Sequence, residues 1–134
     1  MEQNISFNIA GIELLEYAII SPNKAIPNNI SYQFDLNIEH RTNIEQKLVF
    51  VVVTVRVLSE DVDLASAKIS CIYDIANLEE FLSDKKVTLP DEFIVALNSI
   101  SLSTVRGVIF TLFRGTLIHN VILPIVDPKG FIKK

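Results

Sequence analysis

The sequence predicts an α+β fold: a four-stranded antiparallel sheet, arranged as a meander, with one long helix from the C-terminal half packed on it. Three observations favour this fold. Apolar and polar residues alternate in successive segments between residues 31 and 75, short polar connections join these segments, and a long apolar stretch with a proline at its start follows them. Short connections indicate antiparallel pairing, because a parallel pair needs a long crossover.

The length of 134 residues fits one domain, residues 1–134, that buries its own core without disulfides or metals. Hydrophobic residues make up 49% of the chain and charged residues 21%, a composition typical of an ordered globular protein.

The first strand is expected within residues 5–20, where two periodicities compete. Ile5, Phe7 and Ile9 alternate as in a strand, whereas Ile9 and Ile12 also fit helical spacing. We interpret this segment as a strand, because the run from Pro22 to Asn29 then supplies a long loop into the next strand.

The other three strands are predicted over 31–40, 47–58 and 64–75. The second strand has one wet face, and its apolar face carries Tyr32, Phe34, Leu36 and Ile38. The third strand is apolar on both faces and is expected to be central and covered on both sides. The fourth strand again alternates, with Ile69, Cys71 and Tyr73 on one face.

A single helical turn fits residues 77–82, and the long helix is predicted to start near Thr88. Pro90 suits its first turn, Asp91 and Glu92 complement the positive end of its dipole, and Gly115 is a plausible stop signal.

The apolar stripe of this helix is wider than one sheet can cover. It comprises Phe93, Leu97, Ile100, Val108 and Leu112 on one face, widened by Ile94, Val105, Ile109, Phe110 and Phe113. The surplus implies a second partner, either another subunit or a bound apolar chain. We expect Val105, Ile109, Phe110 and Phe113 to form an oligomer interface.

Several classes of protein are disfavoured. Each hydrophobic segment is too short, or too interrupted by polar residues, for a membrane-spanning helix. The N-terminus lacks the pattern of a secretory signal peptide. The net charge of −4, with dispersed Lys and Arg, disfavours nucleic-acid binding. A lone Cys71 suits the reducing cytosol, so we expect a cytoplasmic protein.

The sequence predicts no catalytic residue, metal or cofactor, since it lacks a glycine-rich phosphate loop, paired cysteines and a nucleophile elbow. His40 and His119 fit surface or edge positions better than metal ligation or base catalysis. Cys71 fits a packed side chain better than a nucleophile. Arg106 and Arg114 could clamp an anion, although arginines on a packed helix are the more ordinary interpretation. An enzyme is therefore the least favoured class.

The order of elements, from "GIELLEYAIISPN" through "KLVFVVVTVRV" and "ASAKISCIYDI" to "ALNSISLSTVRGVIFTLFRGTLIHNVILPIVDPKGF", resembles the SecB family of export chaperones. The resemblance implies an ATP-independent holdase that assembles as a homotetramer, a dimer of dimers, and holds unfolded or precursor polypeptides in apolar grooves. It implies six groove residues, which could equally be ordinary core: Tyr32, Phe34, Leu36, Ile69, Cys71 and Tyr73.

Two departures from the family pattern bear on its partner, the translocation motor SecA. Ile20 and Ile72 stand where the family typically carries acidic residues on the outer sheet face, although Glu16 keeps a third, and the chain ends at Lys134, where relatives commonly continue. The coupling to SecA is in doubt. A chaperone dedicated to one client, such as an antitoxin, is one alternative. Others are a structural or regulatory homo-oligomer and a carrier of a small apolar ligand.

Overall fold

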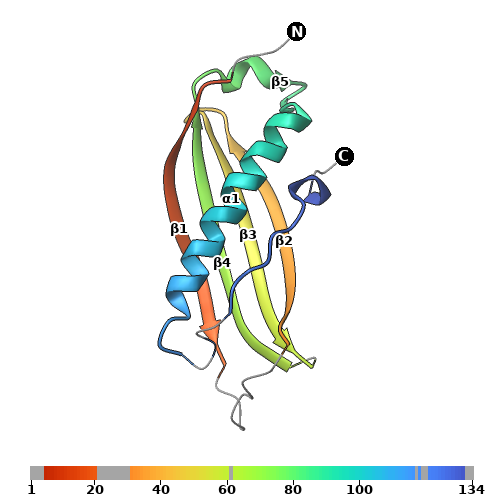
Figure 1. Cartoon of the computed structure of the whole chain (residues 1–134). Coiled ribbons are helices and arrows are strands. Elements are labelled where there is room, and N and C mark those ends of the chain that lie inside the picture. Colours follow the sequence, from red (N-terminus) through yellow and green to blue (C-terminus); the bar gives the residue numbers. More distant parts are fainter. Residues whose placement is uncertain (1–4, 21–30, 61, 117, 119–120, 132–134) are drawn as a thin grey trace.

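A computed structural model describes residues 5–20, 31–60, 62–116, 118 and 121–131. The chain folds into two layers, a twisted antiparallel sheet and a long helix that crosses one of its faces diagonally (Figure 1). The predicted α+β class is confirmed. The loop expected around Pro22 to Asn29 lies outside the described residues.

The sheet contains four long strands in the spatial order β1-β4-β3-β2. Their bounds are Phe7–Ile19 (β1), Gln33–Asn43 (β2), Leu48–Ser59 (β3) and Val62–Ile75 (β4). Strands β2, β3 and β4 form the predicted meander, with tight connections. The expectation of a meander of all four strands is corrected, because β1 pairs with β4 in a Greek-key order.

Two β-bulges interrupt β1 and explain its ambiguous sequence. The register with β4 shifts between Ile9 and Gly11 and again between Leu14 and Glu16. Each shift places one extra residue in β1, so the residues on one face follow at alternating intervals of two and three. The average spacing of about 2.5 residues lies between the strand period of 2 and the helical period of 3.6, so the sequence pattern is ambiguous although the segment is a strand.

The core lies between α1 (Asp91–Leu112) and the two central strands. Alternate residues of β3 from Val49 to Val57 are at most 1% exposed, as are Ile69, Cys71 and Tyr73 of β4. Within this apolar layer the hydroxyl of Tyr73 lies 2.7 Å from Ser101 Oγ of α1. The hydrogen bond fixes the helix over β4, because a buried hydroxyl needs a partner.

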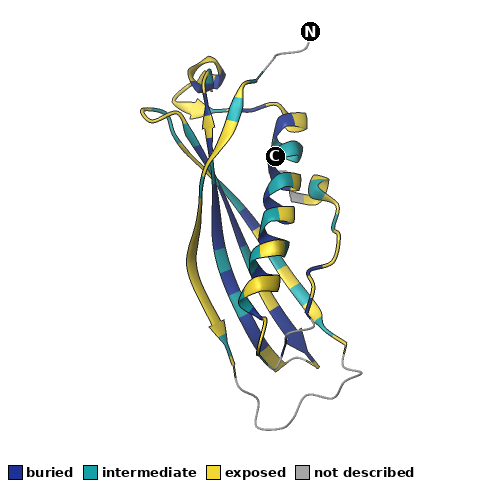
Figure 2. Cartoon of the chain, turned by 60° about the vertical axis from the view of Figure 1, so that its left-hand side comes forward, coloured by how far each residue is buried: buried dark blue, intermediate teal, exposed yellow. Residues whose placement is uncertain are grey.

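The outer face of the sheet carries no second layer among the described residues (Figure 2). β3 is central, as predicted, but the expected cover on both of its sides is not present there. Phe50 is half-buried and Val52 buried. Since no element packs over them, neighbouring side chains of the same face provide the shielding.

Helix α1 starts later than expected, with Pro90 as its N-cap residue rather than within the first turn. It ends at Leu112, and Gly115 follows with a φ of 78°, the left-handed conformation expected of a stop signal. By length and hydropathy α1 could cross a membrane. This is weak evidence for a membrane span, since the core helices of globular proteins meet the same two criteria. Its apolar composition is accounted for by Phe93, Leu97 and the other core residues that it buries.

Three short elements join β4 to α1. A 3-10 turn, η1 (Leu78–Phe81), confirms the predicted helical turn, and a hairpin of β5 (Leu82–Ser83) and β6 (Lys86–Val87) follows. The two residues of its turn, Asp84 and Lys85, both have positive φ. Sequence reasoning missed this hairpin, because such turns usually carry Gly or Asn.

After α1 the chain returns along the helix as an extended segment, residues 121–127, which leads into η2 (Pro128–Phe131). We call residues 121–128 the strap. Val121 and Leu123 are buried, and the Arg106 guanidinium donates to the carbonyls of Leu123 (2.8 Å) and Pro124 (3.1 Å). The strap runs on the side of α1 that faces β2 (Figure 1).

Candidate functional site

Edge strand β1 carries a row of exposed apolar side chains on the face of the sheet that α1 covers elsewhere. Its members, which we call the β1 row, are Ile9 (51% exposed), Ile12 (48%), Leu14 (41%) and Tyr17 (53%). They stand opposite Tyr73, Cys71, Ile69 and Ala67 of β4, all of them buried. Residues directly opposite in an antiparallel pair share a face, so the helix covers β4 and leaves the neighbouring strand bare.

The same strand has an open backbone edge. In the described part of the chain β1 pairs only with β4, so its other side presents unpaired N–H and C=O groups. Figure 2 shows β1 as a mostly exposed strand beside the buried central strands. A long, apolar, unpaired edge is a template for another strand, which adds backbone hydrogen bonds and lays side chains along the row.

The predicted groove residues fall into two groups. Tyr32, Phe34 and Leu36 are half-buried on the helix side of the sheet, at or next to β2, and their role in binding stays a prediction. Ile69, Cys71 and Tyr73 are at most 1% exposed beneath α1, so an accessible groove at these three is corrected to core. They are buried because the helix crosses β4. The alternation of residues within a strand does not specify the angle at which a helix crosses it.

The predicted interface residues divide in a similar way. Val105, Ile109 and Phe113 are at most 1% exposed, because they form the face of α1 that packs on its own sheet. Their assignment to an oligomer interface is therefore corrected. Phe110 is 36% exposed, with the Arg114 guanidinium 5.5 Å above its ring, and remains a candidate contact.

The two sides of α1 differ in how they are covered. On the β2 side the strap buries Val121 and Leu123, and both views show it running along the helix (Figures 1 and 2). On the β1 side the last turns of α1 pass in front of the lower part of β1 (Figure 1), yet the side chains of the row stay 41–53% exposed. The open apolar surface of the sheet on this face therefore lies at β1, away from the groove that the sequence predicted, while the strap exposes Ile122 and Ile125 on its own outer side.

Titratable groups near the core do not form a reactive cluster. Burial raises the pKa of the Cys71 thiol and raises that of Tyr73 to about 12, so both stay protonated at neutral pH. His40 Nε2 lies 2.7 Å from Asn98 Oδ1, and no described group of His, Cys, Asp or Glu has the arrangement of a metal site. His119 lies outside the described residues, and Arg106 holds the strap rather than clamping an anion with Arg114.

Sequence reasoning missed the β1 row as a functional surface, although the signal was present. The strand has apolar residues along one face and also at its two bulge positions, Ala10 and Leu15. An edge strand that faces only water usually carries charged residues, so this composition indicates a partner. Only the strand order reveals that this segment is at the edge, because nothing local distinguishes an edge strand from a central one.

No protein-family model matches the chain, and no curated protein sequence does so either. Among solved structures, the chain is similar to a SecB-like chaperone from Mycobacterium tuberculosis in complex with a ChAD peptide from the HigA1 antitoxin. That similarity has a TM-score of 0.60 at 15% identity and covers 90% of each chain. A protein of unknown function from Streptococcus agalactiae has a TM-score of 0.42 at 12% identity and covers 92% of this chain and 100% of that one. The protein thus has a SecB-like fold.

Proposed function

We propose that this protein is an ATP-independent chaperone that holds non-native polypeptides on the β1 row and the adjoining edge of the sheet. The observation that carries the proposal is the set of four large apolar side chains on one face of an unpaired strand, each 41–53% exposed. The described chain offers no nucleotide motif or reactive cluster that would favour an enzyme.

The physical basis is a sum of weak contacts along an extended client. A strand that pairs with the β1 edge gains backbone hydrogen bonds, while its apolar side chains meet the row from Ile9 to Tyr17. Each buried apolar side chain contributes about 1.5–3 kcal/mol before ordering costs. Folded proteins hide such side chains, so the surface selects unfolded chains without nucleotide.

A role with one dedicated client is favoured over general export. The similar SecB-like chaperone was solved with an antitoxin peptide, which supports a polypeptide client for this fold. Coupling to SecA has weaker support, because Ile72 is an apolar residue of the outer face, in register with Gly11 and Phe50, where the family resemblance implies an acid. The proposal places the protein in the cytosol, which suits the buried free thiol of Cys71.

The alternative is that a second copy of the chain occupies the β1 row, leaving a homo-oligomer that binds no client. The unpaired edge favours this reading as directly as it favours a client, since two such edges can pair with each other. A homo-oligomer up to the expected tetramer is compatible with both readings if only part of the surface is used between copies.

The test is suppression of aggregation of a chemically denatured client, without ATP, by the wild type and by an Ile12→Lys, Leu14→Lys variant. We expect the wild type to suppress aggregation at about equimolar amounts and the variant to lose most of this effect, because two ammonium groups would be desolvated on binding. Ile125→Lys is the matched control, because Ile125 is 91% exposed on the strap and away from β1.

Native mass of the same samples separates the two readings. If the row holds clients, the variant keeps the wild-type mass and loses only the holding activity. If the row joins two copies, the variant becomes smaller. A wild type that leaves client aggregation unchanged at every ratio removes the chaperone proposal, whatever its mass.

A further inference from the structure

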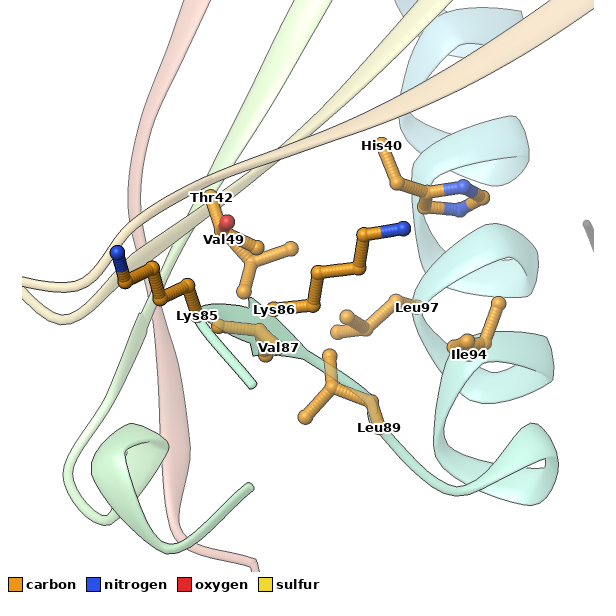
Figure 3. A pocket seen from close by; sticks show the side chains of 9 residues that line it. All are labelled: His40, Thr42, Val49, Lys85, Lys86, Val87, Leu89, Ile94 and Leu97. Atoms are coloured by element: carbon orange, nitrogen blue, oxygen red, sulfur yellow. The ribbon is translucent and has the colours of Figure 1, made fainter. Parts of the chain in front are cut away.

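A pocket of about 320 Å³ opens between the sheet, the β5–β6 hairpin and the first turns of α1 (Figure 3). Its apolar lining comes from Val49 of β3, Val87 of β6, Leu89, and Ile94 and Leu97 of α1. The volume is near the lower limit of small-molecule sites, roughly 300–1,000 Å³. The pocket therefore suits a short apolar body rather than a long chain.

The polar residues of the pocket are His40 and Thr42 from β2 and two lysines, Lys85 and Lys86, from the hairpin. In Figure 3 the Lys86 ammonium points across the pocket toward His40, whereas the Lys85 ammonium points away from it. The side chains of Lys86 and His40 thus bring two nitrogen-bearing groups to one mouth, above the apolar lining.

A hydrogen bond to Asn98 of α1 holds the His40 ring in a defined orientation. Its Nε2 lies 2.7 Å from Oδ1 of Asn98, a fully buried residue of α1, and Asn98 Nδ2 donates to the Pro128 carbonyl at 3.4 Å. The bond to Pro128 assigns the amide nitrogen, so Oδ1 accepts from Nε2–H. The other ring nitrogen, Nδ1, has no hydrogen-bond partner within the described ranges, and with the proton on Nε2 it is an acceptor, open to an N–H donor such as the Lys86 ammonium that points toward it.

The charge of the pocket is opposite to that of the chain. None of its lining residues is acidic, although the protein as a whole carries a net charge of −4. Elsewhere Arg41, Lys47 and Arg56 are paired with carboxylates, whereas neither Lys85 nor Lys86 forms an ion pair with any residue that the structure describes. An ammonium above an apolar lining is complementary to an anion that has a hydrocarbon body.

We propose that this pocket binds an aliphatic carboxylate, with the carboxylate on the Lys86 ammonium and the hydrocarbon body against Val49 and Leu97. Two sources share this chemistry: a free short-chain acid, and the terminal carboxylate of a polypeptide that ends in an aliphatic residue. The pocket lies on the β2 side of the helix, so this site is separate from the β1 row and stands or falls independently of the chaperone function.

The test uses hexanoate as the probe and follows the backbone amide resonances of the full-length protein by NMR. We expect shifts confined to the hairpin, the end of β2 and the start of α1, with saturable binding. Hexanamide, which has the same body without the charge, should bind about two- to fivefold more weakly, because it loses the ion pair with the exposed Lys86 ammonium.

The diagnostic variant is Lys86→Met, which keeps the apolar stem and removes the ammonium. It should weaken hexanoate binding about two- to fivefold, as expected for an ion pair with an exposed lysine, while Lys129→Met, a lysine outside this pocket, should leave it unchanged. Lys86 is exposed on a hairpin, so the fold should be retained. Equal binding of hexanamide, unchanged affinity of Lys86→Met, or the lack of any saturable shift would each overturn the proposal.

A second arm identifies the source. A short peptide that ends in leucine with a free carboxylate competes with hexanoate if the natural ligand is a polypeptide terminus, and fails to compete if the pocket admits only a free acid. Competition by the amidated peptide as strong as that of the free acid would show that the carboxylate is not recognised, against the proposal.

Discussion

Strands β1 and β2 are the two edges of one sheet, and each carries an apolar row on the side that faces α1. On β2 the row reaches Ile38, which is 3% exposed, and the strap lies on this side of the helix. On β1 the corresponding Ile12 is 48% exposed. The same kind of alternating pattern thus gives a buried side chain at one edge of the sheet and an exposed one at the other. The position of the helix and of the strap makes the difference.

The comparison teaches where a function can be placed on this fold. Apolar side chains that α1 or the strap already covers contribute to stability, whereas those that remain open are available to a partner. The pocket beside His40 has a third character, since ammonium groups border it.

The largest effect is expected from truncating matched isoleucines on the two edges. Ile38→Ala should lower the free energy of unfolding by about 2–5 kcal/mol, because it leaves a cavity in the core. Ile12→Ala should lower it by only about 1 kcal/mol, since half of this side chain is in water already. Urea denaturation of both variants measures the difference. Equal losses would mean that β1 is covered in solution, as in an assembly of several copies.

A smaller effect is expected from releasing the strap. Arg106→Gln removes the charged donors to the carbonyls of Leu123 and Pro124 and should lower the free energy of unfolding by about 1–2 kcal/mol. The loosened strap should also increase the fluorescence of a hydrophobic dye, because the β2 side becomes accessible. Arg114→Gln is the matched control, since its guanidinium lies over the exposed Phe110 ring. If Arg106→Gln and Arg114→Gln give the same dye signal, the strap does not cover the β2 side in solution.

The smallest effect at neutral pH concerns Tyr73, which stands opposite exposed Ile9 but lies beneath the helix. Tyr73→Phe should lower the free energy of unfolding by about 1 kcal/mol, because Ser101 loses its partner. Burial raises the pKa of Tyr73 to about 12 from 10.0. A raised pKa means that the stability is fully present below pH 10 and is lost as the pH rises toward 12.

Thermal melts across that alkaline range check the sign. The wild type should lose stability between pH 10 and pH 12 more steeply than the Tyr73→Phe variant, which has no phenol to ionise at this position. Parallel curves for the two proteins would indicate that Tyr73 ionises as freely in the fold as in the unfolded chain.

Much of the fold follows from local pattern, and most of the site does not. The alternation around Phe34 and the valines from Val49 to Val57 predicts β2 and β3 within two or three residues of their ends. The helix was found as well, and Gly115 does adopt the left-handed conformation of a stop. The roles of Ile69 and Val105, by contrast, could not be predicted. Core, groove and interface positions all favour apolar residues, so the residue type does not distinguish them.

Local pattern predicted the four long strands and the long helix, since periodicity, proline position and glycine conformation are local properties of the chain, but it missed the β5–β6 hairpin. The tertiary structure alone decided which strand became the open edge, which face of α1 met the sheet, and where the strap lay. These are outcomes of long-range packing. Strand order, helix angle and the pairing of His40 with Asn98 join residues dozens of positions apart, and local propensity carries no information about such distances.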